Sequence, residues 1–187
     1  RQEIAAGAQL LLSGDMGIGN TTPAATMIAA TLGLSGAEVA GRGTGIDDAG
    51  LAAKIDVIDQ ALARIGDRCE DPMQVLQAVS SADLAATTGY LVTAARSGIP
   101  VLLDGLMSAA CALLAERIAP GAAAWFLAGH RSTERAQSLA LAALGLEPLL
   151  DLGMRLGEGS GAVAAVPVLR SGVAILRDVA LLSELGV

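Results

Sequence analysis

The chain has 187 residues, of which 53% are hydrophobic and 17% charged, and its formal net charge at pH 7 is −7. This length is enough for one well-cored domain, and the acidic balance, without a block of Lys or Arg, argues against a surface for nucleic acid or anionic membranes. Charged residues interrupt each long apolar stretch, so the sequence has no span of about 20 uncharged apolar residues that would cross a bilayer. A small-molecule ligand is the better expectation.

Residues 1–8 are typical of the last turns of a helix, so we expect the sequence to begin within a longer protein. Residues 9–13 form a short apolar run that ends in a glycine loop, which is the pattern of a buried parallel strand. In the helix expected after that loop, Pro23 suits the first helical position and Gly33 suits the end.

The loop itself, GDMGIGNTTP at residues 14–23, resembles a phosphate-binding loop. It matches the glycine and threonine positions of G-x-x-x-x-G-K-[ST], but Asn20 stands where that loop has its lysine. Gly17 and Gly19 let the backbone approach a ligand closely, and the following helix offers N–H groups to an anion. A monophosphate therefore fits better than a triphosphate, although a tight turn without a ligand explains the same glycines.

A second glycine loop, GRGTG at residues 41–45, precedes a long amphipathic helix over residues 49–65. The two aspartates before that helix, Asp47 and Asp48, are natural caps. Lys54 lies near its start and is either a phosphate contact or a solvated surface lysine.

Two more helices are expected, one from Pro72 and one over residues 81–97. Residues 99–103 form the clearest strand, and an alanine-rich helix follows it. Between the two stand Asp104 and Gly105, which either contact a ligand or only make a turn and a helix cap.

Residues 122–128 repeat the pattern of an apolar run that leads into a loop and then a helix ending at Leu144. His130 lies in that loop. It is the only histidine, so it cannot belong to a multi-histidine metal site, and we expect it to make a loop hydrogen bond rather than to catalyse.

Residues 151–187 lack a clear strand and are expected to form a glycine-rich loop followed by one or two helices, with Pro167 near a helix start. Glu158 stands between two glycines in this loop. Its side chain therefore has no sequence neighbours to shield it, and it either points into a cleft or caps the helix that begins shortly after it.

The alternation of short strands and helices predicts an α/β fold, namely a Rossmann-like parallel sheet flanked by helices on both faces, with a helical C-terminal portion. Ligands of such sheets bind at the carboxyl ends of the strands, where the loops after Ser13, Leu103 and Ala128 are expected to lie. Cys69 and Cys111 lack metal-ligand spacing, and we expect both to be reduced thiols of a cytoplasmic protein.

Five blocks together resemble the nicotinate-nucleotide:dimethylbenzimidazole phosphoribosyltransferase family of cobalamin biosynthesis, in order and in spacing, over nearly the whole chain. Each glycine loop alone is weakly specific, whereas the first and last blocks in combination are highly specific. The blocks are GDMGIGNTTPAAT at 14–26, GRGTGIDDAGLAAK at 41–54, VLLDG at 101–105, GHRS at 129–132 and LEPLLDLGMRLGEGSGA at 146–162.

The resemblance implies transfer of the 5-phosphoribosyl group of nicotinate mononucleotide to 5,6-dimethylbenzimidazole, which gives α-ribazole 5′-phosphate and nicotinate. Glu158 matches the family's catalytic base, and Asp15 matches a carboxylate near the ribose. The full set of substrate-binding positions implied is Asp15, Gly17, Gly19, Asn20, Gly43, Gly45, Lys54, Asp104, Gly105, Ser132 and Gly157.

The resemblance also implies a cytoplasmic homodimer that acts on small molecules without a metal or cofactor. It divides the chain into a nucleotide-binding domain at residues 1–150 and, at 151–187, a catalytic glycine loop with C-terminal helices that belong to a small helical domain. Family members are longer at the N-terminus, so we expect part of the family fold to be missing. Two stretches depart from the family pattern, Ser80-Ser81 and Arg135-Ala136-Gln137.

Two other functions stay open at this point. One is a non-catalytic nucleotide-binding fragment or remnant of the fold, which would bind nicotinate mononucleotide without turnover. The other is a kinase or NTPase with a degenerate phosphate-binding loop, which would need a triphosphate and Mg²⁺.

Overall fold

A computed structural model describes residues 1–43 and 45–184, so Thr44 of the second glycine loop and residues 185–187 of the C-terminal portion lie outside the described residues. Its centre is a four-stranded parallel sheet in which the strands lie side by side in chain order. The strands are β1 (Leu11–Leu12), β2 (Val101–Leu103), β3 (Phe126–His130) and β4 (Pro148–Leu150).

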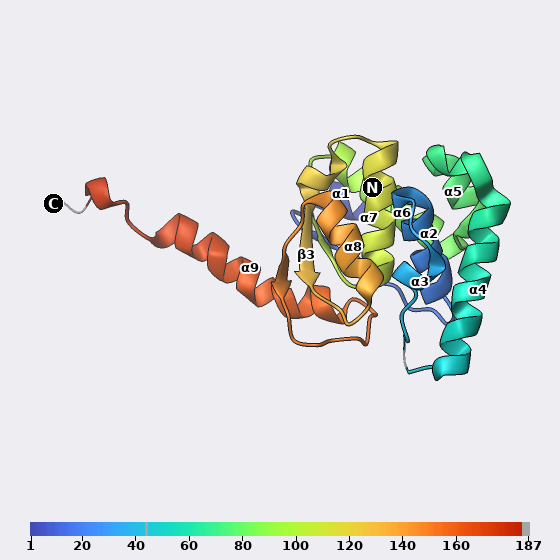
Figure 1. Cartoon of the computed structure of the whole chain (residues 1–187). Helices are drawn as coiled ribbons and strands as arrows, with labels where there is room; N and C mark the ends of the chain where they lie inside the picture. The colour runs from blue at the N-terminus through green and yellow to red at the C-terminus, as the bar shows by residue number, and fades with distance from the viewer. Residues whose placement is uncertain (44, 185–187) are drawn as a thin grey trace.

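Helices make up most of the rest of the described chain (Figure 1). The α-helices are α1 (Gln2–Ala5), α2 (Thr21–Leu32), α3 (Gly36–Val39), α4 (Asp48–Ile65), α5 (Pro72–Val79), α6 (Ala82–Arg96), α7 (Leu106–Ile118), α8 (Arg135–Leu144) and α9 (Ser160–Asp178). Three short 3₁₀ segments accompany them: η1 (Gly66–Glu70), η2 (Ala122–Trp125) and η3 (Leu182–Glu184).

The two faces of the sheet are covered unequally. Because side chains alternate along a strand, Val101 and Leu103 point into the main core, whereas Leu102 points to the other face. That second face holds a small cluster in which Leu102 packs with Ala162 and Ala165 of α9. The prediction of a parallel sheet flanked by helices is confirmed, but the second face is covered mainly by the first turns of α9.

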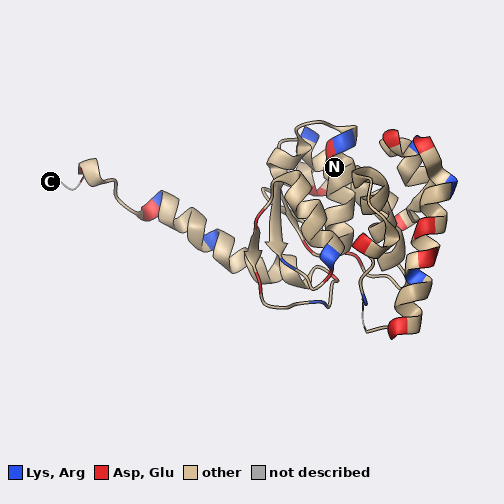
Figure 2. Cartoon of the chain, viewed as in Figure 1, with Lys and Arg blue, Asp and Glu red and all other residues tan. Residues whose placement is uncertain are grey.

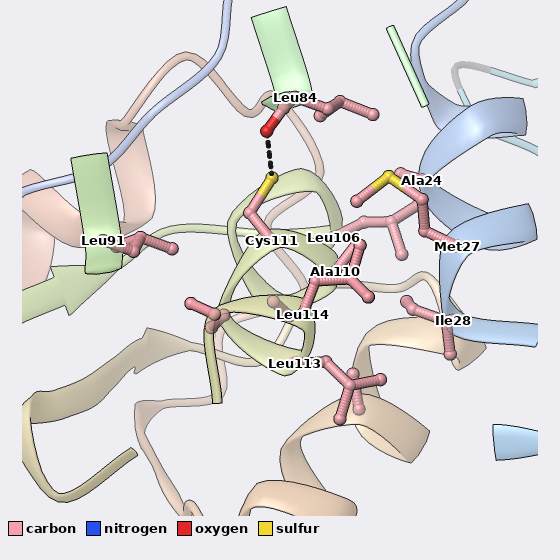
Figure 3. Packing of buried hydrophobic residues seen from close by; sticks show 14 of the residues in the cluster. Ala24, Met27, Ile28, Leu84, Leu91, Leu106, Ala110, Cys111, Leu113 and Leu114 are labelled. Atoms are coloured by element: carbon pink, nitrogen blue, oxygen red, sulfur yellow. Dashed lines mark hydrogen bonds between the residues drawn. The ribbon is translucent and has the colours of Figure 1, made fainter. Parts of the chain in front are cut away.

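The main core surrounds α7, which packs against α2, α6 and α8. Nearly every residue from Leu106 to Ala115 is buried, because this alanine-rich helix lies between the sheet and three other helices. Figure 3 shows Cys111 at its centre, with its thiol donating to the Leu84 carbonyl at 3.3 Å. Burial raises the pKa of Cys111 to about 12, so this thiol stays protonated and unreactive.

Helix α9 starts against β3 and β4 and then extends away from the rest of the chain (Figure 1). Its outer part exposes large apolar side chains, of which Leu176 is 89% exposed. Pro167 lies inside this helix rather than near its start, so that expectation was wrong.

Most predicted helices agree with the structure, but α3 was not predicted, and the strands expected at 9–13 and 99–103 are shorter, at Leu11–Leu12 and Val101–Leu103. Other differences concern three further elements. Residues 122–125 form a 3₁₀ segment and the strand begins only at Phe126. Strand β4 was not predicted at all. Helix α2 begins at Thr21, two residues before Pro23, while Gly33 ends it in the left-handed conformation as expected.

Among the described helices, none is long and apolar enough to cross a membrane. Lys and Arg residues are spread over several elements, whereas α4 carries a series of acidic residues (Figure 2).

The close approach of α9 to the sheet depends on Gly129 of β3. A Cβ at this position would lie 2.7 Å from the Leu103 carbonyl oxygen and 3.0 Å from Ala162 Cα, and both are backbone atoms that cannot rotate away. Gly129→Ala should therefore lower the free energy of unfolding by about 1–3 kcal/mol.

Gly89→Ala is the matched control, because a Cβ there has no atom within 4 Å and alanine is the better helix former. Chemical unfolding of both variants checks the prediction. A Gly129→Ala variant as stable as the parent would contradict the tight packing of α9 on β3.

Candidate functional site

A cavity lies at the carboxyl ends of the four strands, where sheets of this type bind ligands. The loop after each strand contributes to it, including the glycine loop that follows β4. Its lining residues are Asp15, Gly17, Asn20, Thr21, Gly43, Gly105, Leu106, Met107, His130, Ser132, Glu134, Arg155, Leu156, Gly157 and Glu158.

Eight of the twelve sequence-predicted site residues line this cavity: Asp15, Gly17, Asn20, Gly43, Gly105, Ser132, Gly157 and Glu158. The other four do not, namely Gly19, Gly45, Lys54 and Asp104. Gly19 and Gly45 have positive φ angles of 78° and 119°, so they serve the turns of their loops rather than the wall of the cavity.

The first glycine loop is held by its own side chains. Asn20, which replaces the lysine of a phosphate-binding loop, is buried and donates from Nδ2 to Asp15 Oδ2. Gly17 makes this possible, because a Cβ there would lie 2.8 Å from Asn20 Nδ2. Burial raises the pKa of Asp15 against the opposing effect of the Asn20 hydrogen bond, and the nearby charge of Asp83 raises it further.

Lys54 is buried beneath the second glycine loop, so the alternative of a solvated surface lysine is wrong. Its ammonium donates to the Gly41 carbonyl at 2.9 Å and to Thr21 Oγ1 at 3.3 Å. Burial lowers the pKa of Lys54, while the charge of Glu134 partly opposes this. Lys54 therefore ties the two glycine loops together from below the cavity.

Glu134 braces the same loop from the cavity side, and sequence reasoning missed it. Its Oε1 accepts from the Gly43 N–H at 2.8 Å. A Cβ on Gly41 would overlap the Glu134 carboxylate, so the first glycine of GRGTG is needed for this contact. No pattern in the sequence separates Glu134 from an ordinary helix-start glutamate.

Gln137 of α8 connects the ends of β2 and β3 below the cavity. It is fully buried, and its Oε1 accepts from the Ser132 N–H at 2.5 Å. Its Nε2 donates to the carbonyls of His130 (2.8 Å) and Asp104 (3.2 Å). In the sequence, Gln137 was noted only because residues 135–137 depart from the family pattern.

Asp104 is buried behind the cavity and lies against the N-terminus of α9, whereas the helix that directly follows it, α7, has Gly105 as its N-cap and no side-chain cap. Its carboxylate accepts from the backbone N–H groups of Gly159 (3.0 Å), Gly161 (2.8 Å) and Ala162 (3.1 Å). Burial acts to raise the pKa of Asp104, but His130 and these N–H groups outweigh it, so the pKa is lowered below its usual 3.8.

His130 ends β3 and is 1% exposed, with its Nε2 3.4 Å from Asp104 Oδ1. This distance is longer than that of a good hydrogen bond. The imidazole lies against α9, because a Cβ on Gly161 would overlap the ring. His130 thus packs between the cavity and the helix start instead of bonding to its own loop.

Glu158 lines the cavity, and its side chain is exposed. It lies in a tight turn, where its backbone has a strained conformation. The Gly157 carbonyl accepts from the Ser160 N–H at 3.0 Å, and the two residues between them, Glu158 and Gly159, have φ angles of 57° and 78°. Glu158 is the one non-glycine residue with positive φ in the described part of the chain. This conformation costs about 1–2 kcal/mol for a residue with a Cβ.

The remaining residues that line the cavity were not among the predicted site residues. Arg155 contributes a cation to a wall that also carries three acidic side chains, while Leu106, Met107 and Leu156 contribute apolar surface. A cavity with fixed polar groups and apolar surface suits a small ligand that bears both polar groups and a ring.

A family model described as "Phosphoribosyltransferase" (DBI_PRT) matches residues 1–187. Curated relatives are the nicotinate-nucleotide–dimethylbenzimidazole phosphoribosyltransferases of Mycobacterium tuberculosis, 52% identical over 186 residues, and of Corynebacterium efficiens, 49% identical over 186 residues. Each match covers 100% of this chain and 52% or 50% of the relative, so the chain spans about half the length of these relatives.

The structure of CobT from Thermus thermophilus is similar to this chain with a TM-score of 0.94 and 46% sequence identity. The match covers 100% of this chain and 55% of that one.

The carboxylate of Asp104 gives a testable pH dependence. Because its pKa is lowered in the folded state, it stabilises the fold above pH 3.8, and this stabilisation is lost as the pH falls through the folded-state pKa. Asp104→Asn places an amide donor opposite one of the three N–H groups, so it should destabilise the protein at pH 7 by about 1.5–3 kcal/mol. The difference from the parent should shrink below pH 3.8.

The control is Asp71→Asn at the N-terminus of α5, where one side-chain oxygen accepts from Met73 at 2.8 Å. Asparagine caps as well as aspartate there, so a change under about 0.5 kcal/mol is expected. Urea unfolding between pH 7 and pH 3 makes the comparison. An Asp104→Asn effect that is the same at every pH would show that the charge is not what matters.

Proposed function

The chain belongs to the DBI_PRT family of phosphoribosyltransferases, and we propose that an enzyme of the relatives' full length containing it transfers the 5-phosphoribosyl group of nicotinate mononucleotide to 5,6-dimethylbenzimidazole. The products are α-ribazole 5′-phosphate and nicotinate. The observation that carries this proposal is the match over residues 1–187 to a family whose curated relatives bear the name of that reaction.

Nicotinate mononucleotide fits the chemistry of the cavity wall. Its single phosphate needs anion-binding groups. It does not need a lysine at the position of Asn20, because that lysine contacts the β- and γ-phosphates of a triphosphate. The loop at Gly17, which leads into the N-terminus of α2, is proposed to supply those groups; Gly43 lines the same wall, and Lys54 adds positive charge close behind the second loop. Gly105, Ser132 and Gly157 are proposed to complete the substrate-binding surface.

Glu158 is proposed as the general base. One benzimidazole nitrogen bonds to C1′ of the ribose while the bond from C1′ to nicotinate breaks, and the electron pair of that bond stays on the nicotinate ring nitrogen. The proton on the other benzimidazole nitrogen is transferred to the Glu158 carboxylate. An exposed carboxylate at the cavity wall, held in a strained turn, supports this role.

Asp15 is proposed to lie near the ribose. As nicotinate departs, positive charge develops at C1′ and the ring oxygen, and an ionised carboxylate at that place stabilises it. The Asn20 amide donates to the Asp15 carboxylate and so opposes the rise in its pKa that burial and Asp83 cause, which supports the charged form.

The transfer reaction is proposed for an enzyme of the relatives' length. For the 187 residues alone we propose binding of the nucleotide, since the loops that carry the phosphate-site residues are all present.

We also propose a cytoplasmic homodimer. Its support is the family resemblance, the unpaired thiols of Cys69 and Cys111, and the apolar side chains exposed along α9.

Glu158→Gln tests the base. Glutamine keeps the size of the side chain and its hydrogen bonding but cannot accept the proton, so kcat should fall by about 10²–10⁴-fold while the affinity for nicotinate mononucleotide changes little. Steady-state kinetics and calorimetry on the full-length enzyme measure the two quantities. A purely structural Glu158 would instead lower thermal stability and leave kcat within a few fold of the parent.

Lys54→Met tests the phosphate loops. Methionine keeps an apolar stem but removes the charge and the hydrogen bonds to Gly41 and Thr21, so nicotinate mononucleotide should bind more weakly by about 1–3 kcal/mol. Arg64→Met, near the other end of α4, is the control. Unchanged affinity in Lys54→Met, or tighter binding of Mg-ATP than of the mononucleotide by the parent, would contradict the proposed site.

A further inference from the structure

The backbone conformation of Glu158 requires an external restraint. Gly157, Glu158 and Gly159 have φ angles of 78°, 57° and 78°, so three consecutive residues occupy the left-handed region. Glutamate does not favour this region, and the two glycines beside it are free to leave. The segment keeps one shape only if its neighbours hold it there.

Asp104 supplies that restraint from the end of β2. A helix leaves its first four N–H groups without partners inside the helix, and the N-cap of α9 is Gly159, which has no side chain to serve them. Three of the four are bound by one carboxylate, that of Asp104. The fourth, on Ser160, donates to Gly157 and closes the turn around Glu158.

The turn also contacts the first glycine loop and the end of β3. The first glycine loop touches it directly, because a Cβ on Gly14 would lie 2.6 Å from Gly159 Cα. His130 packs against Gly161 on the opposite side and brings its imidazole to 3.4 Å from Asp104. Asp104 directly follows strand β2 of the sheet, so the turn is fixed relative to the loops of the cavity.

We propose that Asp104 is a positioning residue for the transfer reaction: its carboxylate, by holding the N–H groups of Gly159, Gly161 and Ala162, fixes the backbone at Glu158 and so aims the Glu158 carboxylate at the acceptor. This inference rests on the proposed function, in which Glu158 is the base. Asp104 itself does not line the cavity.

Kinetics of the full-length enzyme test the assignment. In Asp104→Asn, kcat should fall by up to about 100-fold, as expected for a base displaced by about an ångström, while KM for nicotinate mononucleotide stays within about threefold. Asp104→Glu keeps the charge but lengthens the side chain by one methylene. Its kcat should therefore fall less than that of Asp104→Asn, and its fold should be more stable than that of Asp104→Asn. Asp71→Asn, which alters a cap far from the cavity, should leave kcat unchanged.

The double variant with Glu158→Gln separates positioning from a direct role. If Asp104 acts through Glu158, Asp104→Asn should have almost no further effect on kcat once the base is gone. An equal fall in both backgrounds would overturn the proposal. If Glu158→Gln alone had near-normal kcat, the proposed base would be wrong, whatever the result at Asp104.

Hydrogen exchange gives a readout that does not depend on activity. The amides of residues 159–162 should exchange at least tenfold faster in Asp104→Asn than in the parent, and at the parent rate in Asp71→Asn. Unchanged exchange at these amides would show that Asp104 does not hold the turn, even if kcat fell.

Discussion

The site depends on one buried carboxylate at the start of one helix. Asp104 stands at the end of a central strand, and its two oxygens take three N–H groups from the first residues of α9. A carboxylate at a helix N-terminus is favoured both by these hydrogen bonds and by the helix dipole, which explains why it stays ionised although it is buried. The second face of the sheet, the glycine turn and the cavity wall all take their positions from this junction.

Glycines make the junction compact. Gly14, Gly129 and Gly161 each lie where a Cβ would meet backbone or the His130 ring, so strand, loop and helix approach to distances that no other residue allows. The left-handed glycines of the turn have a different use, since they let the chain reverse sharply around Glu158. Some glycines of this sequence are therefore needed for space and others for backbone conformation.

The sequence was sufficient to predict the parallel sheet, most helices and the strand ends where the cavity lies, because apolar runs and helix caps are local patterns. It was also sufficient to single out Glu158, which stands alone between two glycines. Strand β4 was missed, since its apolar run of three residues begins with a proline and is bounded by Glu147 and Asp151, whereas β1 and β2 lie in longer apolar runs. The roles of Glu134, Gln137 and Asp104 depend on partners that lie far away along the chain, and no local pattern predicts such partners.

The burial of Lys54 was not predictable for the same reason, and it leaves this stretch of protein with an unusual chemical property. Lys54 is its only lysine, and it is 8% exposed, with its amine bonded to Gly41 and Thr21. Acylating or alkylating reagents that seek side-chain amines thus have a single target within these 187 residues. They reach it only when the contacts of its amine with Gly41 and Thr21 break, so the rate of acylation at Lys54 reports how often those contacts open.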